Sequence, residues 1–158
     1  MAGKKILIAL DYDLSAQMIA EKGQELAKAL QAQVFLLHVI SDAGHYASVN
    51  YAPVMGFDIF NYMDLLQPDT TENLKKAADQ YLASTIEFLG DNSITAIVKE
   101  GDYGDTILDT AKELGVDFLV MGTHSRHGLD KILMGSVVEK VLHKSAIPLF
   151  IVPVKKKN

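Results

Sequence analysis

Short apolar runs alternate with longer segments of helical periodicity along this chain, and this alternation restricts the fold more than any other feature. The runs are rich in Ile, Val, Leu and Phe and comprise Ile6 to Leu10, Val34 to Ile40, Ile94 to Lys99, Asp117 to Met121 and Leu149 to Val152. Apolar residues recur every three or four positions over residues 16–30, 74–86, 107–114 and 137–142. The pattern predicts five strands and four helices.

The predicted strands are apolar at nearly every position. Strands of this kind are covered on both faces of their sheet. The alternation of strands with helices implies right-handed crossovers between parallel strands. We therefore predict an α/β fold, a doubly wound parallel sheet with helices on both faces.

The chain length fits one domain. A chain of 158 residues with 49% hydrophobic content can bury one good core but is too short for two comfortable ones. We expect a single domain over residues 1–158. Because the sequence contains no cysteine, a disulfide framework and thiolate metal sites are excluded, and a reducing cytoplasm fits.

Charge and terminal sequences bear on partners and location. The formal net charge of −5 opposes general attraction to nucleic acid or to anionic lipid. The basic residues Lys155 to Lys157 are expected to be a solvated terminus. Near the amino terminus, Asp11 ends the apolar run, so no signal-peptide core or membrane span is available there. We expect a soluble cytoplasmic protein with no nucleic-acid or membrane partner.

Residues 41–70 do not fit the alternation. This variable segment carries two glycines, two prolines and five aromatic residues, too apolar for disorder and too punctuated for a long helix. We expect a loop with one short helix near Ile59 to Leu66. A connection of this length is often a lid or a partner surface, whereas the alternative is that its aromatic side chains only pack over a helix.

A ligand in an open α/β sheet binds beyond the carboxyl ends of the strands, where the strand order reverses. If the first and fourth strands are neighbours at that point, Asp11 faces the loop that follows Gly122. A carboxylate there can accept hydrogen bonds from ribose hydroxyls while loop amides hold phosphates. Asp13 competes for this role, but close to Ser15 it is better interpreted as the N-cap of the first helix.

The loop from Met121 to Ser136 has features of a phosphate-binding site. Gly122 is expected to let the chain turn sharply as it leaves the strand, and Gly135-Ser136 presents backbone N–H groups and a hydroxyl at a helix start. That end of a helix carries partial positive charge and unpaired donors. The alternative is an ordinary strand-to-helix connection whose glycines only make turns.

The spacing in this loop is more specific than its composition. Gly122 is followed by two residues, then Ser125, then nine residues, then Gly135-Ser136. The spacing resembles the nucleotide signature of the universal stress protein family, a glycine, two residues, a glycine, nine residues, and glycine with Ser or Thr. Further resemblance covers almost the full length, in Lys5 to Asp11, Leu36 to Val39, Gly101 with Ile107 and Ala111, and Asp117 to Val152.

The resemblance implies a fold, an assembly and a ligand. The implied fold is a five-stranded parallel sheet in the order 3-2-1-4-5, and the usual assembly is a homodimer through the last strand, Leu149 to Val154. The implied ligand is ATP or AMP. Apart from the resemblance, a magnesium ion bound through the phosphates is a better interpretation than a dedicated metal site. Asp11 would bind the ribose and Val39 would contact adenine through its backbone. The residues implied to surround the nucleotide are Ala9, Leu10, Asp11, Val39, Met121, Gly122, His124, Ser125, Gly135, Ser136 and Val137.

Ser125 departs from the signature, which has a glycine at that position. A residue other than glycine costs about 1–2 kcal/mol in left-handed geometry. Each charge-assisted bond to phosphate contributes on the order of 1.5–3 kcal/mol. Arg126 and Lys131 are close enough in sequence to supply cations. We therefore expect the chain to bind a nucleotide, with weaker binding of the outer phosphates.

Other chemistries have weaker support. His124 and His127 are spaced like two metal ligands but lack a third, and His38, in an apolar strand, is interpreted as a hydrogen-bonded core residue. The favoured function is a nucleotide-binding regulatory protein of the stress response. One alternative is a stress protein that dimerises without nucleotide, which Ser125 leaves open. Another is a weak ATP-hydrolysing enzyme of the related adenine-nucleotide hydrolases, for which we can name no general base.

Overall fold

A computed structural model of the chain describes residues 3–12, 15–40, 71–123 and 136–154. Every strand and helix predicted from the periodicity is present, with boundaries that differ by a few residues. In chain order the elements are β1 (Lys5–Ala9), α1 (Ala16–Leu30), β2 (Gln33–Ile40), α3 (Thr71–Leu89), β3 (Thr95–Glu100), α4 (Tyr103–Leu114), β4 (Phe118–Gly122), α5 (Ser136–Lys144) and β5 (Leu149–Val152). The segment 41–70 and the short helix expected in it lie outside the described residues.

The strands form one parallel sheet in the order β3-β2-β1-β4-β5, which confirms the predicted fold. In the centre of the sheet, Leu7 of β1 is level with Phe35 of β2 on one side and with Leu119 of β4 on the other. The chain adds β2 and β3 on one side of β1 and then crosses over to add β4 and β5 on the other. The strand order therefore reverses between β1 and β4, and their carboxyl ends lie side by side.

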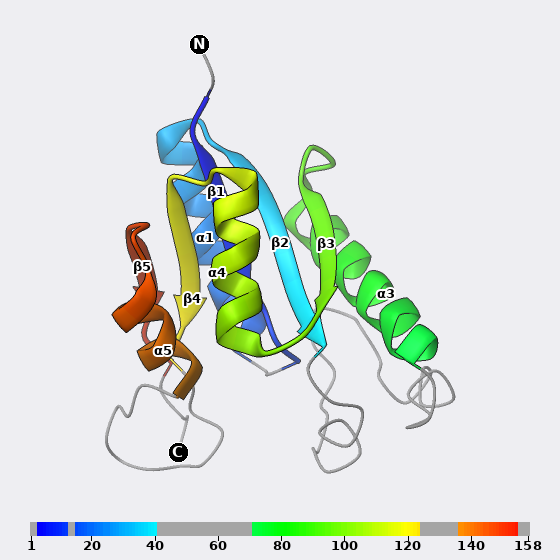
Figure 1. Cartoon of the computed structure of the whole chain (residues 1–158). Coiled ribbons are helices and arrows are strands. Elements are labelled where there is room, and N and C mark those ends of the chain that lie inside the picture. Colours follow the sequence, from blue (N-terminus) through cyan, green and yellow to red (C-terminus); the bar gives the residue numbers. More distant parts are fainter. Residues whose placement is uncertain (1–2, 13–14, 41–70, 124–135, 155–158) are drawn as a thin grey trace.

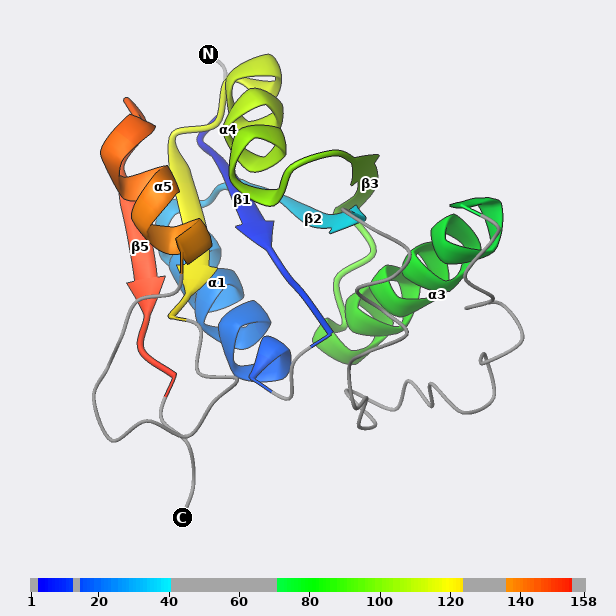
Figure 2. The ribbon, with the colours of Figure 1, turned by 60° about the horizontal axis from the view of Figure 1, so that its bottom comes forward.

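Helices cover both faces of the sheet, α1 and α3 on one and α4 and α5 on the other (Figure 1, Figure 2). Alternate residues of each strand serve the two faces, because successive side chains of a strand point in opposite directions. Ile6 and Ile8 belong to the core under α1 and α3, whereas Leu7 belongs to the core under α4 and α5. All three side chains are fully buried, as expected of a central strand covered on both faces.

Local signals fix the helix ends that bear on the site. Asp102 is the N-cap of α4 and accepts a hydrogen bond from the backbone N–H of Asp105. Ser15 is at the N-cap position of α1, and Asp13, which we expected there, lies outside the described residues.

In the part of the chain that the structure describes, no helix is both long enough and apolar enough to cross a membrane.

Candidate functional site

The candidate site lies at the carboxyl ends of β1 and β4, where the strand order reverses. Leu10 continues the ladder of β1, since its backbone N–H donates to the carbonyl of Leu37 in β2 over 2.9 Å. Asp11 follows as a half-buried residue between the buried side chains of Leu10 and Tyr12. Asp11, whose carboxylate is expected to bind ribose, is therefore the first residue after the hydrogen-bonded end of β1.

His38 supports this strand end from β2. Its ring Nδ1 lies 2.9 Å from the carbonyl oxygen of Leu10. A carbonyl can only accept, so Nδ1 carries the proton and donates. Burial lowers the pKa of His38 from 6.5 to about 4, so the ring is neutral near pH 7. The interpretation of His38 as a hydrogen-bonded core residue is confirmed.

Tyr81 of α3 holds the next carbonyl. Its hydroxyl donates to the backbone oxygen of Asp11 over 2.7 Å. The rings of Tyr12, His38 and Tyr81 pack against one another. The ring centroids are 4.4 Å apart for Tyr12 and His38, 4.8 Å for Tyr12 and Tyr81, and 5.9 Å for His38 and Tyr81. The periodicity over residues 74–86 places Tyr81 on the apolar stripe of a helix and predicts no further role for it. The available signal was that a buried tyrosine hydroxyl requires a hydrogen-bond partner.

Four of the predicted site residues lie together on the face covered by α4 and α5. Val39 and Met121 are buried in the core on that side, and Ala9 and Val137 are partly buried against it. They come from β2, β4, β1 and α5, elements separated widely in sequence. The structure thus brings these four apolar side chains to one face of the sheet, and Ala9 is two residues before Asp11.

Gly122 has a different role from the one we expected. It is the last residue of β4, level with Val152 of β5, and its φ is not in the left-handed region. A Cβ at this position would clash with Cδ1 of Ile19 and would lie 3.2 Å from Cγ2 of Val154. The expectation of a sharp turn at Gly122 was wrong: the residue is part of the strand, and its missing side chain leaves room for Ile19 of α1 and for Val154 after β5.

Thr123 connects the start of the glycine loop to the chain after β5. Its backbone N–H donates to the carbonyl of Val152 over 3.0 Å, and its hydroxyl accepts from the backbone N–H of Val154 over 2.7 Å. Thr123 and Val154 are both buried. The sequence carries no signal for this contact, because it joins residues 31 positions apart.

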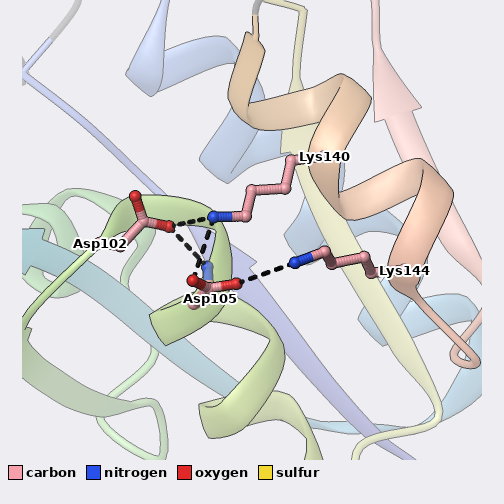
Figure 3. Close-up of polar contacts among 4 residues, drawn as sticks. All are labelled: Asp102, Asp105, Lys140 and Lys144. Carbon is pink, nitrogen blue, oxygen red and sulfur yellow. Dashed lines mark hydrogen bonds and ion pairs between the residues drawn. The ribbon is translucent and has the colours of Figure 1, made fainter.

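Helix α5, which begins at Ser136 of the signature, is tied to α4 by an ion cluster (Figure 3). Lys140 Nζ lies 2.7 Å from Asp102 Oδ2 and 3.0 Å from Asp105 Oδ2, and Lys144 Nζ lies 3.6 Å from Asp105 Oδ1. The hydrogen bond from Lys140 lowers the pKa of Asp102, and the same contact raises the pKa of Lys140. The cluster links α5 to the start of α4 at the surface, while Val138 and Val141 of α5 pack in the core.

The remaining predicted phosphate-loop residues lie outside the described part of the chain. They are His124, Ser125, Arg126, Gly135 and, for its side chain, Ser136. The two-histidine hypothesis for His124 and His127 falls in the same segment. Among the described residues, no group of three or more His, Cys, Asp or Glu side chains could hold a metal ion.

The chain is similar in sequence to proteins of one known family. A family model described as the universal stress protein family matches residues 3–153. Universal stress protein A homolog 2 of Coxiella burnetii is 32% identical over 153 residues, covering 96% of both chains. Universal stress protein MJ0577 of Methanocaldococcus jannaschii is 32% identical over 161 residues, covering 98% of this chain and 96% of that protein.

Solved structures resemble the fold over its whole length. The structure of MJ0577 superposes with a TM-score of 0.69 and 26% identity, covering 98% of both chains. A universal stress protein in complex with cAMP gives 0.56 at 22% identity, covering 96% of this chain and 98% of its own. The Archaeoglobus fulgidus protein in complex with dAMP gives 0.57 at 18% identity with the same coverage. The last two establish similarity of fold alone.

Proposed function

Because this chain belongs to the universal stress protein family, we propose that it binds an adenine nucleotide, ATP or AMP, where β1 and β4 end. The observation that carries the proposal is the position of Asp11 just beyond β1, at the reversal of strand order. Ala9, Val39, Met121 and Val137 share the face of the sheet that α4 and α5 cover. Relatives of the same fold form complexes with cAMP and dAMP, both adenine nucleotides.

The proposed roles divide the ligand into parts. The carboxylate of Asp11 accepts hydrogen bonds from the ribose hydroxyls, and the backbone of Val39 contacts adenine. Leu10, Met121 and Gly122 flank the nucleoside. His124, Ser125, Arg126, Gly135 and Ser136 bind the phosphates, with the start of α5 supplying amide donors. A magnesium ion, when present, is bound through the phosphates rather than by a dedicated cluster of side chains.

The test is calorimetric titration of the purified protein with ATP, ADP and AMP. We expect binding of at least one nucleotide and weakened binding in Asp11→Ala, which removes the ribose acceptor. Asp109→Ala is the matched control, since Asp109 is an exposed aspartate on α4. If none of the three nucleotides binds at millimolar concentration, the proposal is wrong and the chain is a stress protein that acts without nucleotide.

We also propose that the protein is a homodimer through the last strand. β5 is at one end of the strand order, and Phe150 on this strand is 37% exposed. Edge strands of this kind present unpaired backbone groups that a second copy can pair with. Light scattering on a sizing column is expected to give twice the chain mass, and Phe150→Lys is expected to shift the mass toward the monomer. A wild-type monomer at all concentrations would contradict the assembly.

A further inference from the structure

Side chains hold both peptide groups that flank the α-carbon of Asp11. The carbonyl of Leu10 belongs to the peptide group before Asp11 and accepts from Nδ1 of His38 at 2.9 Å. The carbonyl of Asp11 belongs to the peptide group after it and accepts from the hydroxyl of Tyr81 at 2.7 Å. A peptide group is planar, so fixing the two planes fixes the direction in which the Asp11 side chain leaves the backbone.

The two donors are themselves rigid. His38 is 1% exposed and Tyr81 is fully buried, and both rings pack against Tyr12. They come from different elements, β2 and α3, so the backbone around Asp11 is braced from two sides. The bond from His38 is buried and the bond from Tyr81 is partly buried, and burial shields a hydrogen bond from competition by water.

We propose that His38 and Tyr81 are positioning residues of the nucleotide site, which aim the carboxylate of Asp11 at the ribose hydroxyls. This inference rests on the proposed function. It makes α3, which lies outside the signature, a determinant of how well the site recognises ribose. A carboxylate that is aimed before the ligand arrives loses less entropy on binding than one that must be ordered by it.

The decisive variant is Tyr81→Phe, which keeps the ring and deletes the hydroxyl. Affinity is measured by calorimetry for ATP and for 2′,3′-dideoxy-ATP, which lacks the hydroxyls that Asp11 would bind. The wild type is expected to prefer ATP. Tyr81→Phe is expected to lower the affinity for ATP about three- to tenfold, the effect of one hydrogen bond, and to leave the affinity for the dideoxy analogue unchanged.

Two controls separate positioning from stability. Thr85→Val removes another buried hydroxyl of α3, whose bond goes to the carbonyl of Tyr81 within the helix, and is expected to keep the preference for ATP. In an Asp11→Ala background, Tyr81→Phe is expected to cause no further loss of ATP affinity, because the group it aims is absent.

His38 gives a second, independent pair of variants. His38→Leu deletes the donor to Leu10, whereas His38→Asn places an amide N–H near the position of Nδ1. We expect His38→Leu to lose the preference for ATP over the dideoxy analogue and His38→Asn to retain most of it. Far-ultraviolet circular dichroism checks that each variant is folded before it is titrated.

The outcomes are distinguishable. The positioning role is overturned if Tyr81→Phe and His38→Leu fold but lower the affinity for ATP and for the dideoxy analogue equally, or lower neither affinity. It is also overturned if Tyr81→Phe still lowers the affinity for ATP in the Asp11→Ala background. In each of these cases nucleotide binding itself stands. If the wild type binds neither ligand, the proposed function itself fails, and the positioning role fails with it.

Discussion

Nδ1 of His38 donates a hydrogen bond to the carbonyl of Leu10 over 2.9 Å. This contact fixes the tautomer of the ring, whereas burial keeps the ring neutral. Nδ1 must carry the proton because a carbonyl has none to give. Burial opposes a second proton on the ring and lowers the pKa of His38 to about 4. The histidine that holds the Leu10 carbonyl at the end of β1 is therefore neutral.

The lowered pKa of His38 predicts that the protein is less stable in mild acid. Between pH 6.5 and 4 the unfolded chain protonates this histidine and the folded chain does not, so the unfolded state binds more protons and gains stability as the pH falls. The share of the unfolding free energy due to His38 is expected to be about 2 kcal/mol smaller at pH 5 than at pH 7. Urea unfolding at the two pH values measures the change.

His38→Asn isolates this share from the titration of carboxylates. The variant retains an N–H for Leu10 and cannot titrate, so its loss of stability between pH 7 and pH 5 is expected to be smaller than that of the wild type by about 2 kcal/mol. Equal losses in the two proteins would mean that His38 does not remain neutral in the folded state.

Gly122→Ala is expected to destabilise the fold by about 1–3 kcal/mol, the usual cost of overpacking a core. The added methyl group would clash with Cδ1 of Ile19 in α1. Because Ile19→Val removes that atom, Gly122→Ala is expected to cost less in an Ile19→Val background than alone. Thermal unfolding of the four proteins measures the coupling, and additive losses would refute the packing role of Gly122.

A glycine can serve a left-handed backbone or a close packing contact, and this ambiguity illustrates why the fold was more predictable than the site. Periodicity identifies strands and helices because it reports which faces are buried, and the order of strands came from the resemblance to a family. For Gly122 a sequence cannot distinguish left-handed backbone from close packing, since the clash with Ile19 exists only after folding. Contacts such as Tyr81 with Asp11 and Thr123 with Val154 join residues 70 and 31 positions apart, and no local pattern encodes them.

Thr123→Val is expected to loosen the junction between the end of β4 and the chain after β5. Valine keeps the shape but cannot accept from the backbone N–H of Val154, which is left buried without that partner. The expected loss is about 1–3 kcal/mol, and Thr123→Ser, which keeps the acceptor, is expected to lose less. Urea unfolding gives the free energies, and hydrogen exchange at the Val154 amide shows whether the loss is local. A loss in Thr123→Ser that matches Thr123→Val would exclude the hydroxyl as its cause.

Asp102 serves α4 as a cap and α5 as an ion partner, and two substitutions separate these roles. Asp102→Asn keeps a side-chain oxygen for the Asp105 N–H and gives up the charge that Lys140 contacts, whereas Asp102→Ala loses both. We expect the melting temperature to fall more in Asp102→Ala than in Asp102→Asn. The difference between the wild type and Asp102→Asn is expected to shrink at high salt, which screens exposed ion pairs.

Acid provides a further check on Asp102. The hydrogen bond from Lys140 lowers the pKa of Asp102 in the folded protein. The stability that this carboxylate contributes is therefore present above its unfolded pKa and is lost as the pH falls through the lowered folded pKa. The wild type and Asp102→Asn are therefore expected to differ at neutral pH and to converge in strong acid. A difference that persisted there would assign the effect to shape rather than charge.

Ser125→Gly restores the glycine at the one position where the chain departs from the signature of its family, and it tests whether the departure weakens phosphate binding. If the bound loop requires left-handed backbone at this position, a serine costs about 1–2 kcal/mol, which corresponds to roughly a 5- to 30-fold loss of affinity. The strain acts on the phosphate end, so Ser125→Gly is expected to raise the affinity for ATP more than that for AMP. Calorimetric titration of both proteins gives the affinity of Ser125→Gly relative to the wild type for ATP and for AMP.

Ser125→Ala is the control, because it removes the hydroxyl without freeing the backbone and is expected not to raise the affinity. A gain in Ser125→Ala equal to that in Ser125→Gly would assign the effect to the hydroxyl rather than to the backbone.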